Sequence, residues 1–168
     1  WYDIFGDYYQ VLSSKSKASA FGQFFTPETV CNFMSQIISI EDGETLNEPT
    51  CGSGRMNLAV HVRNPKIFHI AQDLDYMCVR MAALNFVMHG VDGLVICMDT
   101  LRMTKDSFRG AFRVNRYLKY TGVPQIEYLS NVDYVFSFIT KKVEAKEQPI
   151  FIIPEKEAVQ FEQLSLQF

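Results

Sequence analysis

The chain has 168 residues, of which 48% are hydrophobic and 21% are charged, and its formal net charge is −3. This length suits one domain with a substantial core, and the composition excludes disordered, collagen-like and highly charged proteins. No apolar run approaches the ~20 residues of a membrane span, so no membrane segment is expected. The sequence starts at Trp1 without a signal-peptide pattern, which favours an excised domain that works in the cytoplasm.

Helices and strands alternate along the first hundred residues. Asp3–Leu12 predicts a helix, and a loop rich in Ser, Lys and Ala follows it. The pair Thr26-Pro27 predicts the start of a second helix, capped by Thr26 and ending near Ser39. The elements expected next are a strand at Thr45–Glu48, a helix at Met56–Arg63, a strand at Ile67–Gln72, a helix at Tyr76–His89 and a strand at Leu94–Met98.

A stretch of basic residues follows. They recur at spacings of three and four from Lys105 to Lys119, which predicts a helix with one positive face. That stripe includes Arg109, Arg113 and Arg116, and a basic face of this kind can neutralise DNA phosphates. An ordinary solvated helix face is an equally good interpretation, and the negative net charge favours at most weak DNA binding by this chain alone.

Two apolar runs complete the predicted sheet. Val132–Phe138 and Ile150–Ile153 are rich in Val, Ile and Phe, as strands are. Strands that alternate with helices predict an α/β fold, with an open, mostly parallel sheet and helices on both faces. The chain shows neither a repeat nor a second composition zone. We therefore expect one domain over residues 1–168, with residues 1–26 as a helical lead-in and residues 27–168 as the α/β core.

The cysteines and histidines predict no metal site. The histidines form no cluster, and the cysteines are far apart, without a Cys-x-x-Cys pair. We expect reduced thiols rather than a disulfide framework. The four cysteines are Cys31, Cys51, Cys78 and Cys97.

The stretch from Glu48 to Gly54 joins the first predicted strand to a helix through a glycine-rich turn. Glycine has no Cβ, so the backbone of such a turn can approach a ligand closely. The dinucleotide fingerprint needs a third glycine where Asn57 stands, and a phosphate-binding loop needs a Gly-Lys-Ser/Thr that is absent here. Taken alone, the turn is equally well explained as a simple connection.

Acidic residues end three successive predicted strands. Glu48 ends the first, where a carboxylate can pair with an ammonium group, and Asp73 ends the second, where it can accept from ribose hydroxyls. Asp99 ends the third, where it can accept from an adenine amino group. These acids would meet at one edge of a parallel sheet, so they predict a site for S-adenosylmethionine, which carries all three groups. Solvated carboxylates at strand ends are the alternative.

At these positions the chain resembles the adenine-specific (N6) DNA methyltransferases of type I restriction–modification systems. The resemblance covers roughly residues 1–103, and its Gly-Gln-Phe-Phe-Thr-Pro and Cys-Gly-Ser-Gly motifs are a specific pair. Glu48 replaces the aspartate with which the family's loop begins. The segments that carry the resemblance are Asp3–Tyr9, Gly22–Pro27, Glu48–Gly54, Gln72–Asp75 and Asp99–Leu101.

The resemblance implies a Rossmann-like methyltransferase fold and a cofactor role for ten residues. Phe25, Thr26 and Pro27 would line the methionine end of S-adenosylmethionine, and the dipole of the following helix would favour its carboxylate. Asp73 would bind the ribose and Leu74 would pack on the adenine. The other implied residues are Glu48 for the ammonium group, Cys51, Gly52 and Gly54 for close backbone, and Asp99 for the adenine amino group.

The family's catalytic motif, Asn/Asp-Pro-Pro-Tyr/Phe after the fourth strand, is not found in the sequence. Its counterpart in Val132–Phe138 would place Phe138 where a hydrogen-bond acceptor for the target amino group is needed. We therefore predict no catalytic residue. The leading interpretation is a cofactor-binding methyltransferase domain that is inactive alone, with a specificity or restriction subunit as its expected partner. The alternatives are a regulatory module with an empty pocket and an active methyltransferase for another class of substrate.

Overall fold

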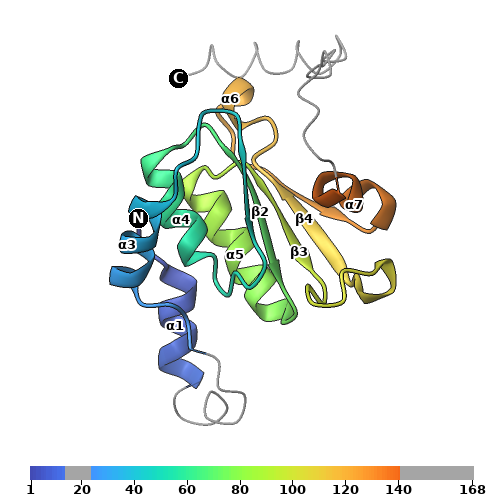
Figure 1. Ribbon diagram of the computed structural model, residues 1–168, viewed down its shortest axis with the longest axis horizontal. Coiled ribbons are helices and arrows are strands. Elements are labelled where there is room, and N and C mark those ends of the chain that lie inside the picture. The colour runs from blue at the N-terminus through green and yellow to red at the C-terminus, as the bar shows by residue number, and fades with distance from the viewer. Residues whose placement is uncertain (14–23, 141–168) are drawn as a thin grey trace, which may run out of the picture.

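Figure 1 shows the computed structural model, which describes residues 1–13 and 24–140. A central sheet separates two layers of helices. The helices are α1 (Ile4–Ser13), α3 (Glu28–Ile37), α4 (Arg55–Arg63), α5 (Tyr76–His89), α6 (Leu118–Thr121) and α7 (Val132–Thr140), with a 3-10 turn at Lys105–Ser107. The strands are β1 (Thr45–Glu48), β2 (Phe68–Asp73), β3 (Gly93–Cys97), β4 (Gly110–Val114) and β5 (Ile126–Leu129).

The five strands lie in the sheet in chain order, β1-β2-β3-β4-β5. β1, β2 and β3 pair in parallel, and helices α4 and α5 make the crossovers between them. β4 runs antiparallel to both β3 and β5. The predicted α/β fold with an open sheet is confirmed. The sheet is parallel from β1 to β3 and mixed as a whole, because β4 is antiparallel, a feature that the sequence patterns did not predict.

Both faces of the sheet are covered, as predicted. On one face, α5 packs its buried side chains, including Val79 and Phe86, against β2 and β3. On the other face, Val135 and Phe136 of α7 pack against Ile70 and Ile96. Figure 1 shows α4 and α5 on one side of the strands and α7 on the other. The carboxyl ends of β1, β2 and β3 therefore meet at one edge between these layers.

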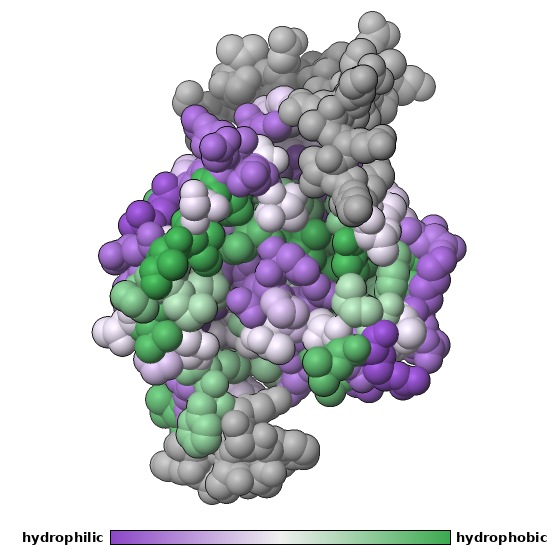
Figure 2. Space-filling model, viewed as in Figure 1, coloured by the Kyte–Doolittle hydropathy of each residue, from purple (hydrophilic) through white to green (hydrophobic). Residues whose placement is uncertain are grey.

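Helix α3 keeps an apolar face at the surface. It begins at Glu28 with Pro27 as its N-cap residue, so the predicted capping by Thr26 is wrong. The exposed fractions of Phe33 and Ile37 are 62% and 65%. Figure 2 shows hydrophobic side chains on the side of the molecule where α3 lies. Among the described residues, no helix has the length and apolarity that crossing a bilayer requires.

The predicted basic helix at Lys105–Lys119 is wrong. Its residues form the 3-10 turn, strand β4 and the short helix α6. Gly110 explains the difference, because its φ of +139° is unsuited to a helix and a Cβ there would lie 2.7 Å from Oη of Tyr128. The basic residues therefore do not share one helix face.

The predicted strand at Val132–Phe138 is also wrong, because this segment is helix α7. Asn131 starts the helix: its Oδ1 accepts from the N–H of Tyr134 at 3.0 Å, and its carbonyl accepts from the N–H of Val135. This capping outweighs the β-propensity of the Val and Phe residues. The other predicted strand, Ile150–Ile153, lies outside the described residues.

Candidate functional site

The glycine-rich turn after β1 adopts a conformation that requires glycine. Gly52 and Gly54 have φ angles of +54° and +90°, in the left-handed region. A Cβ on Gly52 would lie 2.9 Å from the ring of Phe25, and one on Gly54 would lie 3.3 Å from Cβ of Ala82. Cys51 ties the turn to the sheet, since its N–H donates to the carbonyl of Gln72 at 2.8 Å.

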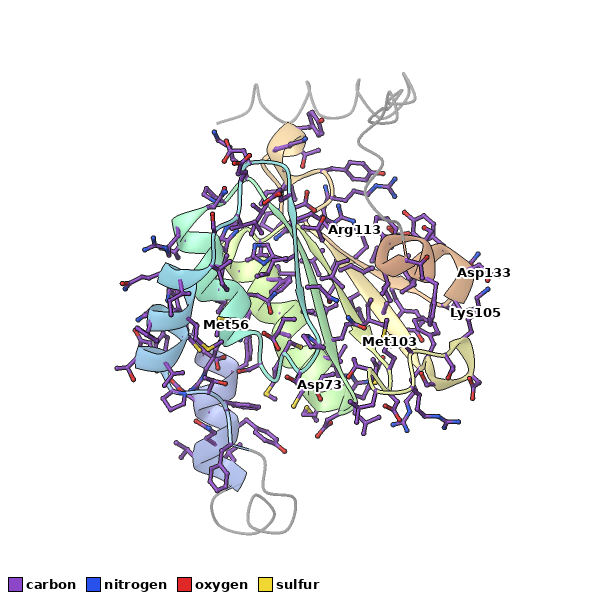
Figure 3. All side chains as sticks on the ribbon, viewed as in Figure 1. Met56, Asp73, Met103, Lys105, Arg113 and Asp133 are labelled. Atoms are coloured by element: carbon purple, nitrogen blue, oxygen red, sulfur yellow. The ribbon has the colours of Figure 1, made fainter. Side chains whose placement is uncertain are left out.

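Asp73, at the end of β2, holds this turn in place. Its Oδ2 accepts from the N–H of Gly52 at 2.9 Å, and its Oδ1 accepts from the N–H of Asp75 at 2.9 Å. Each oxygen keeps a second lone pair for a ligand. Figure 3 shows Asp73 at the end of the sheet, below α4. The next residue, Leu74, is 53% exposed beside it.

The other two predicted acids lie at the same edge of the sheet. Glu48 ends β1, and its Oε1 accepts from the N–H and the hydroxyl of Thr50, both at 3.2 Å. Asp99 follows β3, and its Oδ1 accepts from the N–H of Leu101 at 3.0 Å. The parallel pairing of β1, β2 and β3 thus brings the three carboxylates to one side of the molecule.

A cavity of about 250 Å³ lies between this turn and the start of α3. Five predicted cofactor residues line it: Phe25, Thr26, Glu48, Cys51 and Gly52. The other five lie outside its walls, at Pro27, Gly54, Asp73, Leu74 and Asp99. The cavity thus brings together residues predicted for the methionine end and for the turn, whereas the residues predicted for the nucleoside lie outside its walls. Met56 of α4 also lines the cavity and is labelled in Figure 3.

The thiol of Cys51 is neutral in this setting. Its side chain is buried, and burial raises the pKa of the thiol well above its ordinary value, helped by the nearby negative charges of Asp73 and Glu48. All four cysteines are buried and free of disulfides, as predicted. Among the described residues, no group of His, Cys, Asp and Glu side chains could hold a metal ion.

Sequence reasoning missed a buried polar network next to the turn. Asp3, which is 2% exposed, accepts from Oγ of Ser53 at 2.5 Å, from Nε of Arg55 at 2.6 Å and from Nδ2 of Asn85 at 2.6 Å. Arg55 also pairs with Asp7 of α1. The sequence indicated only that Asp3 starts a helix. In the structure its Oδ1 accepts from the N–H of Gly6 at 2.8 Å, as a helix-capping residue does.

The three arginines predicted to contact nucleic acid are separated in space. Arg113 is buried: its Nη1 lies 2.6 Å from Oδ1 of Asp92, and its guanidinium stacks over the ring of Phe68 at 4.9 Å. Arg109 is exposed before β4, whereas Arg116 follows β4 and stacks on Tyr117. Figure 3 shows Arg113 far from Asp73, toward the opposite end of the strands. The expected shared basic face is therefore absent from this segment.

Comparisons with known proteins identify the family of the chain. The profile of the N-6 DNA methylase family matches residues 1–161. The MjaVIII and MjaVII methylase subunits of type I restriction enzymes from Methanocaldococcus jannaschii are each 30% identical to the chain, over 99 and 98 residues. Each match covers 54% of this chain and 17% of the relative.

A methylase subunit from Escherichia coli matches a shorter part of the chain. This type I restriction enzyme EcoEI methylase subunit is 40% identical over 52 residues, which are 30% of this chain and 11% of that protein. The matched part of the chain thus spans less than a fifth of the length of each of these relatives. Because the family profile covers nearly all of the sequence, the chain belongs to the N-6 DNA methylase family.

Proposed function

We propose that this chain is the S-adenosylmethionine-binding part of an adenine-specific DNA methyltransferase of the type I restriction–modification kind. The observation that carries the proposal is the left-handed turn at Gly52 and Gly54, held between the acids at the ends of β1 and β2. The predicted roles of these residues come from the family resemblance. The match to type I methylase subunits supports the same class of substrate.

The residues around the cavity fit the methionine end of this cofactor. Glu48 is half-buried at the wall and binds the ammonium group, and Phe25 and Thr26 close the cavity from the side of α3. The first N–H groups of α3, after Pro27, favour a carboxylate. Bound S-adenosylmethionine would supply the methyl group from its sulfonium centre.

The nucleoside end fits the open surface beyond Gly52. Asp73 has a lone pair on each oxygen for the ribose hydroxyls, and the exposed Leu74 packs on one face of the adenine. Asp99 accepts from the adenine amino group. Cys51, Gly52 and Gly54 hold the backbone of the turn close to the cofactor. A larger residue at Gly52 or Gly54 would distort the turn.

Calorimetric titration with S-adenosylmethionine and its product S-adenosylhomocysteine tests the proposal. Asp73→Ala removes a charged acceptor and the bond to Gly52, so we expect at least tenfold weaker binding. Asp42→Ala is the matched control, because Asp42 pairs with Lys66 in an exposed ion pair away from the turn. Absence of binding by the wild-type chain at millimolar cofactor would contradict the proposal and favour the regulatory alternative.

We further propose that this chain does not methylate adenine without additional residues. No Asn-Pro-Pro or Asp-Pro-Pro occurs in the sequence. Phe138, the predicted counterpart of the motif's polar residue, lies in α7 and stacks on Phe68 of β2. Such a motif holds the target amino group in line with the methyl group, which lowers the activation free energy by several kcal/mol. Radiolabelled S-adenosylmethionine with mixed-sequence DNA is the test. Stoichiometric label in adenine would contradict this proposal.

The expected macromolecular partners follow from the same family. We propose that the partners of this chain are those of a type I methylase subunit, namely DNA and a specificity or restriction subunit. Arg109 and Arg116 remain candidates for weak phosphate contacts, and the buried Arg113 is not offered for this role. If either arginine contacts phosphate, its replacement by alanine lowers the slope of log affinity against log salt concentration by about 1.

A further inference from the structure

The N-terminal segment makes no wall of the cavity, yet it is fastened to the back of the glycine turn. The carboxylate of Asp3 accepts from four donors: the N–H of Gly6, Oγ of Ser53, Nε of Arg55 and Nδ2 of Asn85. Those donors come from α1, from the turn, from α4 and from α5. A buried carboxylate with this set of partners is strongly fixed in position.

The network reaches the turn from two directions. Ser53 donates its hydroxyl to Asp3 at 2.5 Å, and its carbonyl accepts from Nδ2 of Asn85 at 2.9 Å. Ser53 therefore lies between the two left-handed glycines with both its side chain and its backbone held from behind. Its side chain is 1% exposed, so the hydroxyl has no access to water as a replacement partner.

Arg55 extends the same network to the other wall of the cavity. Its Nη2 pairs with Asp7 of α1, and its Nη1 donates to the carbonyl of Thr26 at 3.4 Å. Its guanidinium lies 5.7 Å from the centre of the Phe25 ring, and the ring of Tyr9 in α1 packs on that ring at 5.9 Å. The helix α1 thus contacts both sides of the candidate site through buried or half-buried side chains.

Gly6 shows how closely α1 approaches the turn. A Cβ at this position would lie 2.0 Å from Oδ2 of Asp3 and 2.5 Å from Oγ of Ser53. Alanine normally favours a helix over glycine, yet here it would separate α1 from the turn. The absence of a side chain at Gly6 is therefore a requirement of the contact.

We propose that Asp3 is a positioning residue for the cofactor turn, so that docking of α1 and binding of S-adenosylmethionine stabilise each other. This inference rests on the proposed cofactor function. Asp3 does not line the cavity itself and acts through Ser53 and Arg55, which do. When α1 is docked, the turn between Gly52 and Gly54 is held in the conformation that binds S-adenosylmethionine. Bound cofactor, in return, favours the docked helix.

The test compares Asp3→Asn with Asp42→Asn, an identical change in an exposed ion pair. We expect at least tenfold weaker S-adenosylmethionine binding for Asp3→Asn, because an amide nitrogen in place of Oδ2 would face the donors of Ser53 and Arg55, and in place of Oδ1 those of Gly6 and Asn85. We expect no change for Asp42→Asn. Hydrogen exchange is the second measurement. Exchange of the Gly52 and Gly54 amides should accelerate at least tenfold in Asp3→Asn, and cofactor should slow exchange in α1 of the wild-type chain.

Two further variants apply if Asp3→Asn does not fold. Ser53→Ala removes one hydroxyl and should weaken cofactor binding about three- to tenfold. Gly6→Ala should also weaken binding, because its Cβ would separate α1 from the turn although alanine has the higher helix propensity.

The outcomes separate this inference from the proposed function. Wild-type binding together with unchanged affinity and exchange in the variants would overturn the positioning role and leave the proposed function intact. Absence of wild-type binding would overturn the proposed function and the coupling to the cofactor. Exchange rates at Gly52 and Gly54 would still decide whether Asp3 holds the turn.

Discussion

The two halves of the sheet differ in how their polar residues are used. In residues 45–99, acidic side chains end the strands and lie at one edge, while the strand interiors are apolar or hydrogen-bonded. In residues 105–140, the charged side chain of Arg113 is built into the core beside β3 and β4. One half places its charges around the candidate site, and the other uses a charged side chain for packing.

This difference shows where sequence patterns are informative. Asp73 and Asp99 follow apolar runs, and Glu48 begins the segment that leads to the glycine turn, so the place of all three at the sheet edge follows from local order. The spacing of basic residues in the second half fits a helix, but Gly110 has a φ of +139° and opens strand β4. A charge periodicity without an apolar periodicity of the same length is a weak signal.

Arg113→Ala should give the largest effect and tests the structural role of this arginine. The change removes the ion-pair partner of Asp92, the donor to the carbonyls of Gly93 and Val114, and the stacking on Phe68. We expect the free energy of unfolding to fall by about 3 kcal/mol in a urea titration, a value reduced because Asp92 is partly exposed.

Arg109→Ala is the matched control for that change. Arg109 is exposed, so its loss should alter the free energy of unfolding by less than about 0.5 kcal/mol. Equal effects of the two variants would contradict the buried position of Arg113 and support the predicted basic face that includes both arginines.

Val135→Ala tests whether residues 132–140 are a helix. In a strand, Asp133, Val135 and Ser137 would share one face, but in α7 only Val135 of these three is buried. We expect Val135→Ala to lower the free energy of unfolding by about 2 kcal/mol and Ser137→Ala to change it by less than about 0.5 kcal/mol. Similar losses in both variants would favour the strand.

Much of the fold and part of the site could be predicted, for local reasons. Glycine turns and strand-end acids depend on neighbouring residues, and a sequence shows neighbours directly. The network of Asp3 could not be predicted, because its partners Ser53 and Asn85 are 50 and 82 positions away. No periodicity links such residues, and only the packing of α1 on α5 brings them together.

Gly52→Ala tests whether the turn, rather than any left-handed glycine, matters for the ligand. Gly52 and Gly122 have similar φ angles of +54° and +67°, so alanine costs a similar backbone energy of about 1 kcal/mol at both. Only at Gly52 would the new Cβ meet another side chain, the ring of Phe25, because the space at Gly122 is open.

We therefore expect Gly52→Ala to weaken S-adenosylmethionine binding at least tenfold and Gly122→Ala to leave it unchanged, both measured by calorimetry. Equal losses of affinity in the two variants would show that general destabilisation is responsible. Equal retention would contradict the assignment of the turn to the cofactor.

The smallest expected effect near neutral pH comes from His69, in β2. This side chain is fully buried, and burial, together with the positive charge of His61, lowers its pKa to about 3. In the unfolded chain the His69 imidazole takes up a proton near pH 6.5, whereas in the folded chain it remains neutral down to about pH 3. Stability contributed by the neutral ring is therefore complete above about pH 7.5 and declines as the pH falls.

Lowering the pH from 7 to 6 should reduce the free energy of unfolding by about 0.7 kcal/mol through His69 alone, and the slope should approach about 1.4 kcal/mol per pH unit below pH 6. Urea titrations at each pH measure this slope. His69→Asn should remove most of it, while His61, whose pKa is also lowered by burial, retains a remainder. A wild-type chain whose stability does not change between pH 7 and 5 would place a charged or solvated histidine in β2, and the packing of this strand against α5 would then be wrong.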